Sequence, residues 1–256
     1  MRSLSPPPPA LLLVHYWLPV GIGWSLAMVM RESAHLPFSL WGITLLLAGI
    51  GTAYSLDRLH PAPVQPGVRR LLWAATLGCG ALTAVAAFRL PASVFGVAAL
   101  LGGVSLFYPA LKRLPLGKTV LVTGAWLWAC AWFPFAATGA SPLGWLGWDA
   151  TPPLLFLMGA ACILCDIQDR EEDRRDRVPS LPALFGTGAT CRISTALALA
   201  GSLLALAAGR YGLMSAGAVL AVLAQFPGLL EQKALGPLVV DATLLLPGIV
   251  ILVNGP

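Results

Sequence analysis

Long apolar stretches recur through almost the whole chain, with only short polar segments between them. They lie near residues 10–30, 36–56, 71–88, 91–111, 119–139, 151–168, 191–209, 212–230 and 234–253. A helix needs about 20 apolar residues to cross the hydrocarbon core of a bilayer. Proline, glycine and charged residues separate the stretches, as is typical of helix ends. The pattern predicts an all-α, polytopic integral membrane protein with nine transmembrane helices, organised as a single transmembrane domain over residues 1–256.

The composition agrees with a chain that uses the bilayer as its solvent. Hydrophobic residues make up 57% of the chain and charged residues 11%, whereas soluble domains carry about 25% charged residues. This excludes a soluble enzyme, a disordered tail and a nucleic-acid-binding module, so no nucleic-acid partner is expected. The pair Cys162-x-x-Cys165 has the spacing of a redox or zinc motif, but neither a second pair nor a nearby histidine accompanies it. We interpret both cysteines as small buried side chains.

The basic residues are divided unevenly between the two sides that nine helices would define. Thirteen of the 16 fall at the N-terminus, at the start of the seventh stretch, or after the second, fourth, sixth and eighth stretches. The other three are Arg31, Arg89 and Arg210. Cytoplasmic loops of membrane proteins carry an excess of lysine and arginine. We therefore expect a plasma (inner) membrane protein with its N-terminus in the cytoplasm and its C-terminus on the opposite side.

Acidic residues concentrate after the sixth stretch, where six of the 11 fall within residues 166–176. If the helix continues into this segment, a rotation of about 100° per residue places Asp166, Asp169 and Asp173 within roughly 60° of one another. Asp169 and Asp173 then repel each other unless a cation lies between them. Two interpretations remain open from the segment alone: a Mg²⁺–diphosphate site, or a solvated helix end with ion pairs such as Asp166–Arg170.

Two polar segments contain three further elements of interest: Asp169-x-x-x-Asp173, the continuation from Ser180-Leu-Pro to Gly186, and Tyr108-x-x-x-Lys112. Together they resemble the UbiA superfamily of intramembrane prenyltransferases. The family has nine helices in a bundle, a D-x-x-x-D motif after the sixth, an S-L-P-x-x-x-G-like continuation, and a Y-x-x-x-K element after the fourth. The resemblance covers nearly the whole chain. Arg177 is a small departure, because a glycine is common at this position.

The resemblance implies a role for several residues at what would be the cytoplasmic face. Asp169 and Asp173 resemble the ligands of Mg²⁺-bound diphosphate, and Asp166 resembles an auxiliary metal ligand one turn earlier. Tyr108 and Lys112 resemble the catalytic pair near the diphosphate and its leaving group. The candidate diphosphate-binding residues are Arg58, Lys112, Arg170 and Arg174.

The first aspartate motif of the family is largely absent. The family norm after the second helix is N-D-x-x-D-x-x-x-D, but this chain reads Ala53-Tyr-Ser-Leu-Asp57-Arg58-Leu-His-Pro61. Only Asp57 corresponds, and it is the remaining metal ligand and catalytic candidate in that segment. The sole asparagine of the chain is Asn254, so the full motif does not occur elsewhere.

The resemblance implies a membrane prenyltransferase that binds a Mg²⁺–prenyl diphosphate and transfers the prenyl group to a lipophilic, aromatic acceptor within the lipid bilayer. A carbocation intermediate needs a dry cavity and aromatic faces. The fourth and fifth stretches provide candidates for these faces, unless they are interfacial anchors: Phe107, Tyr108, Trp126, Trp128, Trp132 and Phe133. Two alternatives stay open: a terpene cyclase on the same scaffold, and a non-catalytic lipid- or diphosphate-binding protein. Asp241, about two turns into the last stretch, is a separate functional candidate or an acid paired near the interface.

Overall fold

A computed structural model of the chain describes residues 9–59, 66–139, 149–233 and 235–254. Every regular element in these ranges is helical, and no strand occurs among them. The elements are α1 Pro9–Ser33, α2 Leu40–Leu59, α3 Pro66–Ala87, α4 Ser93–Leu111, α5 Gly117–Leu127, the π-helical η1 Trp128–Trp132, α6 Phe133–Thr138, α7 Thr151–Cys165, the 3₁₀ turn η3 Asp166–Asp169, α8 Arg170–Arg175, α9 Leu181–Ala207, α10 Tyr211–Leu223, α11 Pro227–Leu230, α12 Leu235–Thr243 and α13 Leu246–Asn254. The all-α prediction is confirmed for the described residues.

Each predicted apolar stretch contains a helix of the described chain, but not all of these helices are long enough to span a bilayer alone. Five described helical segments have the length and composition to cross a membrane: Gly67–Ala87, Gly117–Thr138, Thr151–Arg175, Leu181–Ala207 and Leu235–Val253. Three shorter apolar helices are Leu40–Leu56, Ser93–Val104 and Tyr211–Leu223. The number of nine membrane crossings therefore stays a prediction.

Helix boundaries differ from the predicted stretches where proline and glycine intervene. Helix α9 begins at Leu181, ten residues before the predicted seventh stretch, with Pro182 in its first turn. The eighth stretch is divided by Pro227, which begins the short α11. The ninth is divided between α12 and α13, and Pro247 stands near the start of the second. Proline has no amide hydrogen to donate, so it is tolerated in a first turn and interrupts a helix elsewhere.

Helix α7 lies at the centre of the bundle, packed against α5, α9, α10 and α12. Its Leu154 and Leu157 are completely buried. Close approach of α10 depends on Gly217, because a Cβ there would lie 2.6 Å from the side chain of Leu157. The hydroxyl of Ser194 on α9 donates a hydrogen bond to the carbonyl of Ala160, at 3.0 Å. Small residues and buried hydroxyl bonds of this kind are typical of helix packing in membranes.

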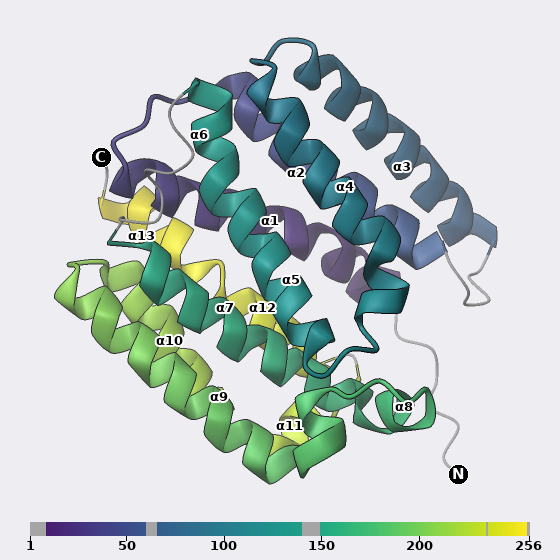
Figure 1. Cartoon of the computed structure of the whole chain (residues 1–256), viewed down its shortest axis with the longest axis vertical. Helices are drawn as coiled ribbons and strands as arrows, with labels where there is room; N and C mark the ends of the chain where they lie inside the picture. Colours follow the sequence, from purple (N-terminus) through teal and green to yellow (C-terminus); the bar gives the residue numbers. More distant parts are fainter. Residues whose placement is uncertain (1–8, 60–65, 140–148, 234, 255–256) are drawn as a thin grey trace.

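Helix α3 is the most peripheral of the long helices. It packs mainly on α2 and lies across the molecule from α9 and α10 (Figure 1). Large apolar side chains on its surface are exposed, among them Leu71, Trp73, Leu77 and Leu82. A soluble protein rarely exposes so continuous an apolar surface, so we assign this face to lipid.

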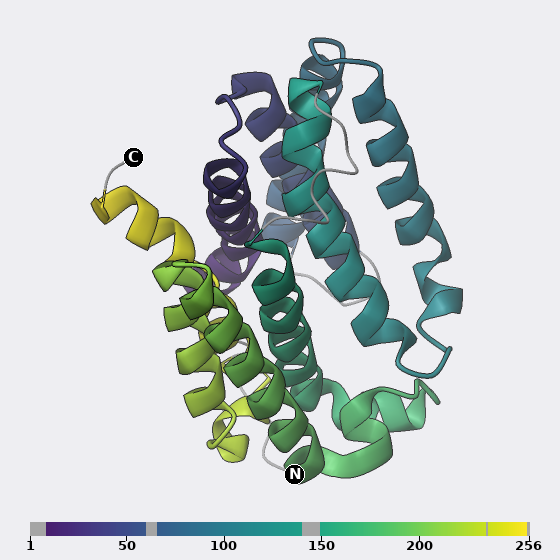
Figure 2. The same ribbon diagram turned by 60° about the vertical axis from the view of Figure 1, so that its left-hand side comes forward.

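Polar segments collect at one end of the bundle. The turn between α4 and α5 and the segment through η3 and α8 both lie there (Figure 2). The turn between α3 and α4 and the helix α13 lie towards the other end. The two segments that carry the candidate motifs are therefore neighbours in space, although about 50 residues separate them in the sequence.

Candidate functional site

The candidate site forms where the α4–α5 turn meets the segment that links α7 to α9. A backbone hydrogen bond joins the two, from the amide of Leu116 to the carbonyl of Pro179, at 3.3 Å. Leu116 adopts a left-handed backbone conformation, with φ 58°. Gly117 follows it and leaves no room for a side chain, because a Cβ would lie 2.3 Å from the carbonyl oxygen of Leu111. This tight turn fixes the direction in which the next residue, Lys118, points.

Lys118 lies between the three aspartates of the acidic segment. Its Nζ is 3.1 Å from Asp166 Oδ1, 2.9 Å from Asp169 Oδ2 and 3.2 Å from Asp173 Oδ2. The hydroxyl of Thr119 donates a further hydrogen bond to Asp166 Oδ2, at 3.1 Å. The predicted carboxylate stripe is therefore a real spatial cluster, and the cation within it is an ammonium group.

The cluster is shielded from solvent on most sides. The side chains of Lys118, Asp166 and Asp173 are 14%, 9% and 10% exposed, whereas that of Asp169 is 35% exposed. Charges taken out of water need a partner, since the desolvation penalty otherwise outweighs the remaining interactions. Each buried carboxylate has one in Lys118. Asp169 is the member of the cluster that a solute reaches most easily.

The arginines of the same segment turn away from the carboxylates. Arg170 pairs with Glu171, at 2.7 Å, and donates to the hydroxyl of Thr187 on α9, at 2.9 Å. Thr187 in turn donates to Glu231 beside α11, at 3.0 Å. Arg174 donates to a backbone carbonyl near the start of α9. Within the described residues, the i,i+4 pairing of Asp166 with Arg170 is absent. Both arginines connect α8 to α9, and Arg170 also pairs with Glu231 just after α11.

Of the other sequence-predicted residues, Tyr108 and Lys112 lie at the end of α4. Tyr108 is in the last turn, and its carbonyl accepts the backbone amide of Lys112, at 2.9 Å. Among the described residues, no ion pair joins Lys112 to the three aspartates. Asp57 and Arg58 belong to the last turn of α2, but their side chains lie outside the described residues.

Aromatic and polar side chains lie between the helices further into the bundle. The rings of Tyr54 on α2 and Trp126 on α5 are 6.4 Å apart between centroids. The thiol of Cys165, at the end of α7, lies 3.7 Å from Asp241 Oδ1 on α12. Asp241 is therefore partnered, and its expected functional role stays a prediction. Tyr54 also lies within electrostatic range of Asp241, so these groups form one neighbourhood.

Comparison with known proteins identifies the family. The model of the UbiA prenyltransferase family matches residues 64–233, which include both segments of the site. The chain belongs to the UbiA prenyltransferase family. A search of curated proteins finds no match.

Solved structures of UbiA homologues share the fold over almost their whole length. The apo structure of a UbiA homologue from Aeropyrum pernix K1 matches with a TM-score of 0.65 at 20% identity, and the match covers 94% of this chain and 98% of that one. A homologue from Archaeoglobus fulgidus bound to DMAPP and Mg²⁺ matches with a TM-score of 0.54 at 15% identity, covering 93% and 99%. The same homologue bound to GPP and Mg²⁺ gives 0.57 at 16%, covering 95% and 98%. With the five long apolar helices, family membership makes this an integral membrane protein.

The UbiA resemblance implies Mg²⁺, and the three aspartates fit that ion in kind but not in spacing. Carboxylate oxygens are the ligands that Mg²⁺ prefers, at about 2.0–2.1 Å. Around Lys118 the oxygens stand at 2.9–3.2 Å, which is the spacing of a hydrogen-bonded ammonium. Within the described part of the chain, no group of three or more histidine, cysteine or acidic side chains is arranged to hold a metal ion.

Sequence reasoning missed Lys118 as a residue of the UbiA site and counted it only as a basic loop residue. It also missed Thr119 and the partners of Arg170, which are Thr187 and Glu231. One signal was available for Lys118. It is a lysine directly after a Leu-Gly turn, in the segment predicted to face the acidic one. The UbiA pattern drew attention to Lys112 instead, six positions earlier.

Proposed function

We propose that this chain binds a prenyl diphosphate at the cluster of Lys118, Asp166, Asp169 and Asp173, and transfers the prenyl group to a lipophilic, aromatic acceptor. The observation that carries the proposal is the convergence of these groups where two family motifs meet, at one end of a UbiA bundle. The homologue structures with DMAPP or GPP and Mg²⁺ support the ligand class. We place the site on the cytoplasmic side, in agreement with the distribution of basic residues.

An allylic diphosphate ionises when the negative charge that develops on the leaving group is stabilised. Lys118 is the cation that the described residues place at the cluster, and Lys112 lies six residues earlier, at the C-terminal end of α4. We assign Lys112 and Tyr108 to the leaving group, with Arg58 as a further cation. Arg170 and Arg174 contact diphosphate only if they leave their present partners.

Mg²⁺ belongs to the proposal as the ion that accompanies the diphosphate. When bound, it would supply neutralising charge to the phosphate oxygens. The carboxylates proposed to receive it are Asp57, Asp166, Asp169 and Asp173. Asp169 is the most accessible of the three described ones.

The prenyl chain needs a dry, apolar path with aromatic faces, since water would capture a carbocation and a ring face stabilises one. We propose that Tyr54 and Trp126 line this path, because they face each other between α2 and α5, and α5 also carries Lys118. Asp241 and Cys165 lie in the same neighbourhood and provide the polar contact that a phenolic acceptor would use.

Thermal unfolding of the purified protein tests the binding step. With geranyl thiodiphosphate, a poorly hydrolysed analogue, plus Mg²⁺, the wild type should be stabilised by about 2.7 kcal/mol at a hundred times Kd. For a chain of this size, this is a rise in Tm of roughly 5–10 °C. An Asp169→Asn/Asp173→Asn double variant should lose the ligand-induced shift. Asp149→Asn, which removes an exposed acid at the start of α7, is the matched control and should keep it.

Absence of any analogue-dependent shift in the wild type would contradict both enzymatic interpretations. Where the shift is found, incubation with authentic prenyl diphosphates separates the remaining alternatives. Transfer requires an added aromatic acceptor and yields a prenylated product together with diphosphate. A cyclase would release a terpene hydrocarbon or alcohol with no acceptor present, and a binding protein would release neither.

A further inference from the structure

The position of Lys118 has a consequence for the charge of the proposed diphosphate site. Asp166, Asp169 and Asp173 provide three carboxylate groups and Lys118 provides one ammonium group, so the formal charge of the cluster is about −2. One divalent cation balances that charge. If the lysine were absent, the same carboxylates would need more than one divalent ion, or a proton in addition to one.

The ammonium is built into the fold and is not a surface side chain that happens to fall nearby. The lysine comes from α5, and its carboxylate partners come from two consecutive elements of one segment, η3 with Asp166 and Asp169 and α8 with Asp173. Gly117 admits no side chain, and the amide of Leu116 bonds to Pro179, so the lysine leaves the turn in a fixed direction. Its three N–O distances of 2.9–3.2 Å are all within hydrogen-bond range.

The first polar segment has few carboxylates that could hold a second metal ion. The family pattern there has three aspartates and an asparagine, whereas this chain has Asp57 alone. A chain with fewer carboxylates has fewer ligands for a second Mg²⁺. It also has a lysine whose charge lies where the carboxylates of the other segment converge.

We propose that Lys118 is a tethered cation that takes the place of one metal ion, so that the site works with a single divalent ion. This deepens the proposed function and rests on it for the identity of the ligand. The lysine permanently offsets one of the three carboxylate charges of the Asp166–Asp169–Asp173 cluster. A single Mg²⁺ would supply the remaining positive charge, and the first polar segment would have no need for a complete aspartate motif.

Replacement of the lysine tests the inference without any prenyl ligand. Lys118→Met removes the charge and keeps most of the apolar stem, so three carboxylates should be left facing one another. In EDTA this variant should unfold at a Tm several degrees below the wild type. Addition of Mn²⁺ should restore it, and electron paramagnetic resonance should count one more bound Mn²⁺ per chain than in the wild type.

A second lysine of the same region provides the control. Lys233 pairs with Glu172 on α8 but is 62% exposed, so Lys233→Met removes an equal charge from a single solvated pair. It should change neither the Tm in EDTA by more than about a degree nor the number of bound Mn²⁺ ions. If Lys118→Met is too unstable to purify, Lys118→Met/Asp169→Asn lowers the uncompensated charge, and its yield and Tm should exceed those of the single variant.

Equal Mn²⁺ stoichiometry in wild type and Lys118→Met would overturn the proposal, as would a variant whose Tm does not respond to divalent ions. The result is independent of diphosphate binding. A Mn²⁺ gain in Lys118→Met supports the tethered cation even if geranyl thiodiphosphate fails to bind the wild type, in which case the ligand proposed above is the part that is wrong.

Discussion

Arg177 ends helix α8 in a conformation that side chains rarely adopt. Its φ is 56°, and the amide of Val178 bonds back to the carbonyl of Asp173, at 2.8 Å. This is the bonding pattern of a Schellman cap, whose left-handed position is usually glycine. The glycine that is common at this place in UbiA relatives therefore has a conformational reason. In this chain an arginine occupies the position at a cost of about 1 kcal/mol.

Arg177→Gly should consequently stabilise the protein. Removing the left-handed strain stabilises the folded state by more than the extra conformational entropy of glycine stabilises the unfolded chain. We therefore expect the free energy of unfolding to rise by up to about 1 kcal/mol. Thermal unfolding in a fixed detergent measures it. Arg175→Gly, inside α8, places glycine in a helical conformation and should lower the stability instead. A lower Tm for Arg177→Gly would show that the guanidinium contributes more than its backbone conformation costs.

At the level of single residues, the sequence predicts groups that share a helix better than groups that meet across helices. Helical rotation predicts that Asp166, Asp169 and Asp173 lie close together, and the structure keeps them together although Asp166–Asp169 form a 3₁₀ turn and not an α-helix. Lys118 lies 51 positions from Asp169, so its place depends on how α5 packs against α7. No local pattern reports that packing. The outward orientation of Arg170 has the same origin, because its partners Thr187 and Glu231 lie on later helices.

Gly186 sets the geometry of an entire element, the long helix α9. Its φ of 77° and ψ of 167° lie in a region that is essentially restricted to glycine, and they bend the helix after its first turn. The bend is followed directly by Thr187, which bonds Arg170 and Glu231. The glycine of the Ser180–Gly186 motif therefore turns the start of α9 towards the acidic segment.

Gly186→Ala should destabilise the protein by about 1–3 kcal/mol, because a Cβ is strained in that backbone conformation. Gly188→Ala is the matched control two residues later. It is an exposed helical position where a Cβ meets nothing within 4 Å, so the change should be neutral or stabilising by up to about 1 kcal/mol. Tm values of the two variants, measured side by side, should be clearly lower for Gly186→Ala than for Gly188→Ala. Equal values would show that the bend can shift to another residue.

Among the elements, helix existence is predictable from hydropathy and helix ends are less so. The first ten residues of α9 lie outside the predicted stretch, because the polar Thr187 and Thr190 interrupt the apolar pattern there. The π-helical η1 was also missed. Pro134 cannot donate a backbone hydrogen bond, and just before it the amide of Phe133 reaches the carbonyl of Trp128, five residues back. A hydropathy pattern contains no signal for that local change in helical pitch.

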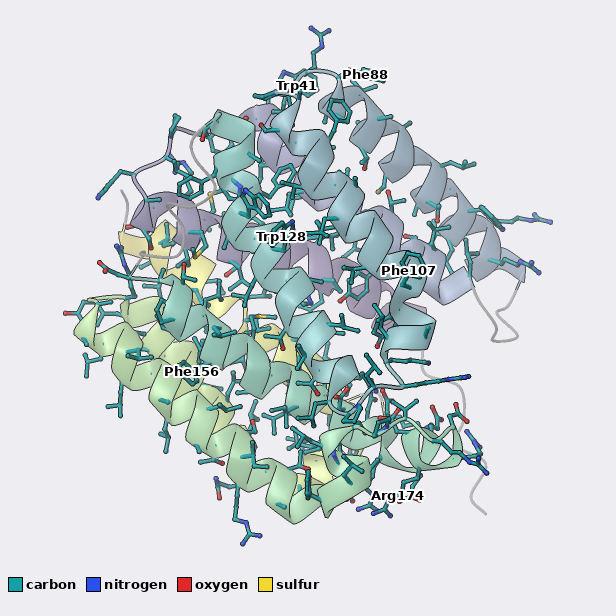
Figure 3. All side chains as sticks on the ribbon, viewed as in Figure 1. Trp41, Phe88, Phe107, Trp128, Phe156 and Arg174 are labelled. Carbon is teal, nitrogen blue, oxygen red and sulfur yellow. The ribbon has the colours of Figure 1, made fainter. Side chains whose placement is uncertain are left out.

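At the scale of the whole molecule, basic residues are distributed unevenly between the two ends of the bundle. Arg174 lies at one end, and Trp41 and Phe88 lie at the other (Figure 3). Arg89 stacks over the ring of Trp41, 5.7 Å from its centroid, and so belongs to the end that is poor in basic residues. Helix α13 also extends towards that end (Figures 1 and 2). The charge asymmetry expected of cytoplasmic loops thus coincides in space with the end that carries the proposed site.

We therefore predict that the proposed site faces the cytoplasm and that α13 ends on the opposite side of the membrane. In a bacterial host, alkaline phosphatase fused after Asn254 should be active, because that enzyme folds only in the oxidising periplasm. Green fluorescent protein fused there should be dark. Fusions truncated after Lys233, on the side of the site, should give the reverse pattern. Fluorescence of the fusion after Asn254 would place the C-terminus in the cytoplasm. That result would contradict an odd number of membrane crossings with a cytoplasmic N-terminus.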